Sequence, residues 1–156
     1  MIRKESGEAI GRDFFCIGAM GHTFALAYGI TMGSSSRRVF CIDGDGSFVM
    51  HVGNNAVLAG VSYPNVIHVV IYNGIHSFTG NQPLMIRKDD FLAMAEGLTY
   101  KQKLFVDNAE GLIKACESAI KSTLIIVAVN DSVRKNLPRP TESPQELKCI
   151  FMKSFA

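Results

Sequence analysis

The sequence has no marked excess of either charge and no segment long enough to cross a membrane. Among its 156 residues, Lys and Arg number 16 and Asp and Glu number 14, a formal net charge of +2. This balance, without a basic stripe, argues against a nucleic-acid-binding protein, because such proteins cluster positive charge. No apolar run approaches the ~20 residues of a membrane-spanning helix, and no signal-peptide pattern opens the chain. We therefore expect a cytoplasmic protein that binds neither nucleic acid nor membrane.

The cysteines lack the spacing of a metal site or a redox pair. There is no CxxC pair, and no histidine stands at metal-ligand spacing from Cys16, Cys41, Cys116 or Cys149. Three of the four lie in apolar runs, so we expect buried free thiols in a reducing compartment. The sequence also lacks GxGxxG after its first predicted strand, which argues against a Rossmann-type nucleotide-binding protein.

What the sequence does contain is a regular alternation of apolar runs and helical patterns. Apolar residues make up 47% and charged residues 19%, which is typical of a globular chain. Short apolar runs predict strands at 14–17, 39–42, 66–72, 104–106 and 124–129. Helical spacing predicts helices at 22–32, from 47 onward, at 89–96 and 109–121, and from Ser143 to the end. Because the strands are continuously apolar, both faces should be covered, which predicts an α/β fold with a parallel sheet and helices on both faces.

We interpret residues 1–156 as one domain. A charged lead-in occupies 1–13, and prolines mark a linker before the last helix, within 137–156. Ser143 and Glu146 form a capping-box pattern at the start of that helix.

The segment Gly44-Asp45-Gly46-Ser47 is the first candidate site. It follows a buried strand and opens a helical pattern, an arrangement that presents backbone N–H groups to an anion. Asp45 would repel such an anion unless a cation lay between them, and Mg²⁺ bridges carboxylates and phosphates in this way. Gly-Asp-Gly is also an ordinary turn, so the segment alone does not decide between the two interpretations.

A second residue makes the metal interpretation more specific. Asn73 ends the next strand, with 26 residues between it and Gly46. Ligands bind beyond the carboxyl ends of parallel strands, where we expect the turns at 18–21, 43–47 and 73–80 to meet. Asp45 and Asn73 would then converge on one Mg²⁺.

This pattern resembles the thiamine-diphosphate motif, which is GDG followed after roughly 25–30 residues by Asn. GAMGH at 18–22, CIDGDGSFVMHVG at 41–53, NGIHSFTGNQP at 73–83 and NLPRP at 136–140 extend the resemblance. Together they resemble the diphosphate-binding half of the phosphonopyruvate decarboxylase family, with the sulfopyruvate decarboxylases as a close alternative. The resemblance implies a thiamine-diphosphate-binding fold and a 2-oxo acid decarboxylase that uses thiamine diphosphate and Mg²⁺.

The resemblance also implies roles for individual residues. Asp45, the Asn73 side chain and the Ile75 carbonyl would hold Mg²⁺, and the backbone around Gly46 would bind the diphosphate. Met20 would hold the cofactor bent. The full set of cofactor-binding residues expected is Gly18, Ala19, Met20, His22, Gly44, Asp45, Gly46, Ser47, Asn73 and Ile75.

Four histidines and one glutamine are further candidates. His76 and Gln82, in the 73–83 loop, are the candidates for contact with substrate. His22 would either face the diphosphate or pack at a helix start. His51 and His68 lie within a helix and a strand and are expected to be structural.

The chain departs from the family pattern in several features. Tyr72 replaces the Asn that commonly precedes the metal-binding Asn, which puts a larger group under the cofactor. The glutamate that relays a proton to the pyrimidine, and the first strand and helix of the domain, have no counterpart in this sequence. We therefore expect a pyrimidine-binding partner chain, a homo-oligomer, or both; the alternative is a non-catalytic domain that acts by association.

Overall fold

The computed structural model describes residues 12–34, 36–61, 65–119, 122–132 and 140–154. The chain divides into two compact units, the larger spanning Met20–Ser132 and the smaller joining the residues before and after it. The lead-in expected at 1–13 and the proline linker lie largely outside the described residues.

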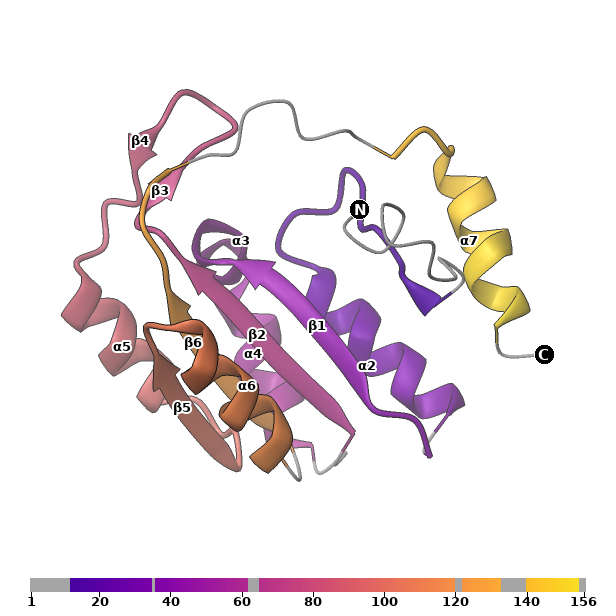
Figure 1. Ribbon diagram of the computed structural model, residues 1–156, viewed down its shortest axis with the longest axis horizontal. Helices are drawn as coiled ribbons and strands as arrows, with labels where there is room; N and C mark the ends of the chain where they lie inside the picture. The colour runs from indigo at the N-terminus through magenta and orange to yellow at the C-terminus, as the bar shows by residue number, and fades with distance from the viewer. Residues whose placement is uncertain (1–11, 35, 62–64, 120–121, 133–139, 155–156) are drawn as a thin grey trace. The chain divides into compact units, whose positions relative to one another are not determined.

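Four strands of the larger unit form one parallel sheet, as the sequence predicts (Figure 1). In spatial order they are β1 (Val39–Gly44), β2 (Val66–Tyr72), β6 (Thr123–Ala128) and β5 (Gln102–Val106). A hairpin of β3 (Ile75–His76) and β4 (Gln82–Pro83) follows β2 at its carboxyl end. The carboxyl ends of β1 and β2 are adjacent, since Gly44 pairs with Ile71.

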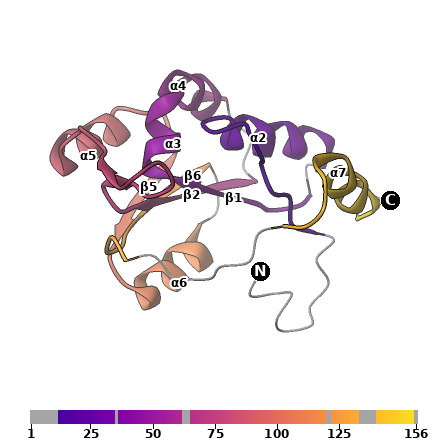
Figure 2. The same ribbon diagram turned by 90° about the horizontal axis from the view of Figure 1, so that it is seen from above.

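Helices cover both faces of this sheet (Figure 2). One face carries α2 (Thr23–Gly33), α3 (Asp45–Met50), α4 (Val52–Gly60) and α5 (Lys88–Glu96), and the other carries α6 (Ala109–Ser118). The connections from β1 to β2 and from β2 to β5 run in one direction across the sheet, whereas β5 to β6 runs back. Because such crossovers are right-handed, the helix of the returning connection must lie on the opposite face.

The buried residues of β2 alternate between two cores. Val66 and Val70 pack with α2, α3, α4 and α5 in one core, and Ile67 and Val69 pack with α6 in the other. This explains why the strand reads as a continuous apolar run. In contrast, β1 buries only alternate residues, and Ile42 is exposed on the α6 side of the sheet.

Three details of the sequence prediction were wrong. Residues 14–17 form no strand; Phe14 instead packs edge-on against Phe151, with ring centroids 5.4 Å apart. The helix expected from Ser47 begins at Asp45 and breaks at His51, so Ala56 is exposed rather than buried. All four cysteines are free, but Cys41 is the only one of them that is buried.

The smaller unit contains α7 (Pro144–Lys153), which begins with the predicted capping box. The Ser143 hydroxyl accepts the Glu146 N–H, and the Glu146 carboxylate accepts the Ser143 N–H. No helix in the described parts of the chain is both long and apolar enough to cross a membrane.

Candidate functional site

The Asp45 carboxylate joins the ends of β1 and β2. Asp45 is the first residue of α3, and its side chain is buried. Its Oδ1 accepts the N–H of Gly46 at 2.7 Å, and its Oδ2 accepts the N–H groups of Asn73 at 3.0 Å and Gly74 at 2.6 Å. The structure therefore brings Asp45 and Asn73 together, as expected for residues that end adjacent parallel strands.

The Asn73 side chain is oriented by its own loop. Its Oδ1 accepts the Ile75 N–H at 3.1 Å, and its Nδ2 donates to the Ser77 hydroxyl at 3.2 Å. Gly74 adopts a positive φ of 73°, which lets the chain turn tightly between Asn73 and Ile75. A side-chain amide oxygen and the start of the β3 hairpin are thus fixed beside the Asp45 carboxylate.

We call the Asp45 carboxylate and the Asn73–Ile75 turn beside it the Asp45 corner. The donor chemistry of the Asp45 corner fits Mg²⁺ and a phosphate ligand. Among the described residues no group of three or more His, Cys, Asp or Glu side chains could hold a metal ion. A cation beside Asp45 would be bound by this carboxylate, by neutral amide and carbonyl oxygens, and by oxygens of its ligand. Mg²⁺ favours such hard oxygen donors and is commonly bound with substrate phosphates.

A histidine ring lies against the backbone of Gly46, the residue next to Asp45. A Cβ added to Gly46 would lie 2.6 Å from His76 Cε1 and 3.6 Å from the terminal methyl of Met20. Two residues predicted for the site, from different loops, therefore meet over the start of α3. Ser47 joins the same corner, since its hydroxyl accepts the Gly21 N–H at 2.8 Å.

Sequence reasoning missed the part played by His51. A Cβ on Gly21 would lie 2.3 Å from His51 Cδ2, and Gly21 has φ of +87°, so only glycine fits there. The His51 ring also contacts the His22 ring, with centroids 4.3 Å apart. His51 lies at the break between α3 and α4, and a helical pattern alone gave no signal of its contacts with the 20–22 loop.

Tyr72 packs against the core at the end of β2, and its hydroxyl lies near Gly74: a Cβ added there would lie 3.8 Å from it. Its half-buried ring packs against Phe91, with centroids 4.9 Å apart. Burial first, and then the charges of Asp45 and Asp89, raise the pKa of Tyr72. The phenol is therefore neutral at physiological pH.

Three other predicted residues are Gly18, Ala19 and Gln82. Gly18 and Ala19 belong to the smaller unit. Gln82 is exposed in the hairpin, where its amide bonds to the hydroxyl and the carbonyl of Thr79. These contacts close the turn and do not extend to the Asp45 corner.

Comparison with known proteins gives a consistent set of similarities. Residues 8–129 match the family described as thiamine pyrophosphate enzyme, C-terminal TPP binding domain. The chain is 29% identical over 143 residues to phosphonopyruvate decarboxylase of Streptomyces viridochromogenes, which covers 90% of this chain and 36% of that protein. It is 27% identical over 146 residues to sulfopyruvate decarboxylase subunit beta of Methanococcus maripaludis, covering 92% of this chain and 78% of that protein.

A third relative, phosphonopyruvate decarboxylase of Streptomyces hygroscopicus, is 29% identical over 148 residues. This match covers 93% of this chain and 36% of that protein. The chain thus spans just over a third of the length of both phosphonopyruvate decarboxylases.

Proposed function

The chain belongs to the thiamine pyrophosphate enzymes as a C-terminal TPP-binding domain, and on this premise we propose that it forms the diphosphate- and Mg²⁺-binding half of a 2-oxo acid decarboxylase. The observation that carries the proposal is the Asp45 corner, where a buried carboxylate bonds to the N–H of Asn73. The family motif pairs these two residues, and the fold brings them into contact.

In this proposal Asp45, the Asn73 side chain and the Ile75 carbonyl hold Mg²⁺. The three backbone N–H groups that Asp45 accepts fix its carboxylate before any ligand binds. Fixed ligands stabilise binding because little conformational freedom is then lost. Gly44, Gly46 and Ser47 line the diphosphate at the start of α3, where the Ser47 amide faces it and the Gly46 N–H holds Asp45.

The residues around this corner would position the organic part of the cofactor. Met20 and His76 both lie close to Gly46, so in this proposal both are beside the backbone that binds the diphosphate. Met20 would contact the cofactor's rings, and His76 would contact cofactor or substrate. Gly18, Ala19 and His22 complete the proposed cofactor set, and Gln82 remains a proposed substrate contact. Thiamine diphosphate, when bound, supplies the electron sink for the departing CO₂.

Phosphonopyruvate is the proposed substrate and sulfopyruvate the second candidate. Both names occur among relatives of similar identity that cover nine-tenths of this chain. The two acids differ in the anionic group on C3, a phosphonate or a sulfonate. Recognition of that group requires a cationic contact, which we assign to a partner chain.

The lengths and names of the relatives support a pyrimidine-binding partner for this chain. The chain spans 36% of the phosphonopyruvate decarboxylases, and another relative is named as a beta subunit. Phe78 lies in the loop of the β3–β4 hairpin, Met85 follows the hairpin, and both side chains are about nine-tenths exposed. A partner chain that packs on this hairpin would cover them.

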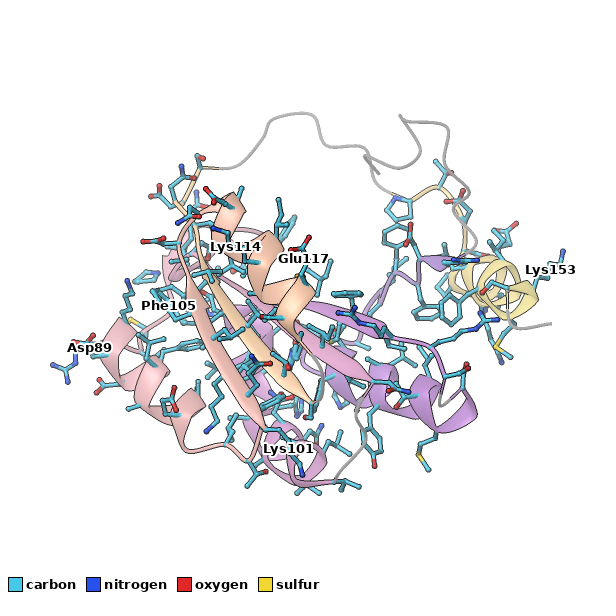
Figure 3. The ribbon with its side chains drawn as sticks, turned by 60° about the horizontal axis from the view of Figure 1, so that its bottom comes forward. Asp89, Lys101, Phe105, Lys114, Glu117 and Lys153 are labelled. Atoms are coloured by element: carbon cyan, nitrogen blue, oxygen red, sulfur yellow. The ribbon has the colours of Figure 1, made fainter. Side chains whose placement is uncertain are left out.

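The metal site is tested by removing one charge while keeping the side-chain shape. Asp45→Asn should weaken Mg²⁺-dependent binding of thiamine diphosphate at least about tenfold, a loss of ~1.4 kcal/mol, because the carboxylate is the one charged ligand. Asp89→Asn, which removes an exposed carboxylate from α5 (Figure 3), is the control and should bind as the wild type does. Equal binding by both variants would contradict the assignment.

The substrate is tested by measuring CO₂ release from phosphonopyruvate, sulfopyruvate and pyruvate, using this chain mixed with its co-purifying partner. Preference for phosphonopyruvate would support the proposal. Preference for sulfopyruvate would move the chain to the second candidate, and preference for pyruvate would contradict both.

A further inference from the structure

A row of buried polar side chains runs beneath the turn that carries Asp45. The Tyr100 hydroxyl lies 2.7 Å from Nδ1 of His68, and both residues are buried. The imidazole stacks flat on Phe24, with centroids 4.5 Å apart and planes 7° from parallel, and Phe48 packs against it from α3. These contacts from two helices hold the ring in one orientation.

The other nitrogen of His68 faces a carboxylate. Nε2 lies 3.7 Å from Oδ2 of Asp43 and has no hydrogen-bond partner. The second oxygen of Asp43, Oδ1, accepts the N–H of Gly44 at 3.0 Å. Gly44 immediately precedes Asp45, so the row Tyr100, His68, Asp43 ends at the backbone of the proposed metal site.

The protonation of this row follows from burial. Desolvation lowers the pKa of His68 and raises the pKa of Tyr100, so both are neutral at physiological pH. A neutral imidazole carries one N–H, and the nearby carboxylate favours its location on Nε2. The Tyr100 hydroxyl then donates to Nδ1. At 3.7 Å the Nε2–H and Asp43 are beyond hydrogen-bond distance, but they attract in a low-dielectric interior.

We propose that Tyr100 and His68 are positioning residues for the Asp45 turn: they fix Asp43, which holds the Gly44 N–H and so sets the direction in which the chain leaves β1. A purely apolar side chain at position 68 would leave the largely buried Asp43 carboxylate with the Gly44 N–H as its remaining hydrogen-bond partner. That this turn serves thiamine diphosphate rests on the function proposed above, but the coupling itself is a property of the chain alone.

The direct test is NMR of the isotope-labelled full chain without cofactor. The ¹⁵N shifts of His68 should identify a neutral ring protonated at Nε2. Tyr100→Phe removes the hydroxyl that fixes this tautomer. Hydrogen exchange should then accelerate at Gly44 and at the three amides that Asp45 holds, at least about threefold more than at the amides of β5 and β6.

The matched control is Thr31→Val, which removes another buried hydroxyl, bonded to the Tyr28 carbonyl at 2.7 Å in α2. Its effect on exchange should be uniform, without a local rise near Asp45. An Nδ1-protonated ring in the wild type would overturn the proposal, as would a uniform effect of Tyr100→Phe. Because the readout needs no ligand, failure of thiamine diphosphate to bind would count against the proposed function and leave this result unaffected.

Discussion

At the scale of single residues, the sequence predicted which residues lie together when a motif specifies both the residue types and the number of residues between them. Asp45 and Asn73 were found because GDG and a distant Asn form a two-part pattern on adjacent strands. The contacts of His51 and Tyr100 were not predicted, because they depend on which side chains meet after folding. His68 was assigned a structural role, and the structure adds the contacts with Asp43 and Tyr100 that a strand pattern cannot show.

The buried His68 predicts an acid-sensitive fold. Its pKa is lowered in the folded state, chiefly by desolvation, so below the unfolded pKa of ~6.5 the unfolded chain takes up a proton that the folded chain does not. Stability should therefore fall as the pH drops through this window, by at most about 1.4 kcal/mol per pH unit for this group. Urea titrations at several pH values from 7.5 to 5 measure this change in the free energy of unfolding.

Replacing His68 by Asn should remove this part of the slope. The exposed His22→Gln is the control and should leave the slope in place. Parallel pH profiles for the wild type and the His68 variant would show that the buried imidazole is not responsible.

The close packing of His76 on Gly46 gives a second residue-level prediction. Gly46→Ala should destabilise the chain by about 1–3 kcal/mol, because the added methyl overlaps the His76 ring. Gly29→Ala in α2 is the contrast: nothing lies within 4 Å of its Cβ, and alanine should stabilise the helix by about 0.5–1 kcal/mol. Equal changes in the midpoint of thermal unfolding would argue against the observed contact.

At the scale of elements, periodicity located the helices and strands but not every boundary. The interruption at His51 was missed because apolar spacing continues across it, from Val49 to Val52. The break follows from tertiary contacts, since His51 packs on Gly21 and the Asn55 amide donates to the Phe48 carbonyl. Phe14 to Ile17 read as a strand because a short apolar run does not distinguish strand pairing from packing on a helix.

Helix α6 offers a test of local capping. The Asn108 side chain accepts the Gly111 N–H at 2.8 Å, and at the other end Arg38 donates to the Cys116 carbonyl at 2.7 Å. Asn108→Ala should cost about 1 kcal/mol of unfolding free energy. Lys114→Ala, which removes only the exposed pair with Glu110 (Figure 3), should cost no more than about 0.5 kcal/mol. The reverse order in urea titrations would contradict the capping argument.

At the scale of the whole molecule, the sequence predicted the parallel sheet and its two helical layers because the β2 run is apolar on both faces. With the observed strand order, the right-handed connections place α6 on the face opposite α4 and α5 (Figure 2). The exposed face of β1 could not be read from its sequence, since Phe40 and Ile42 have the same character as buried residues. Their exposure, and that of Phe78 and Met85, is what the partner chain proposed above would cover.

The central claim is that this chain binds thiamine diphosphate through Mg²⁺ at the Asp45 corner. The most direct measurement is calorimetric titration of thiamine diphosphate into the wild-type chain, once with Mg²⁺ and once with the metal chelated. We predict a dissociation constant of about 1 mM or lower with Mg²⁺, and binding weaker by at least about tenfold without it. Equal affinity in the two titrations, or no binding by a chain shown to be folded, would contradict the claim.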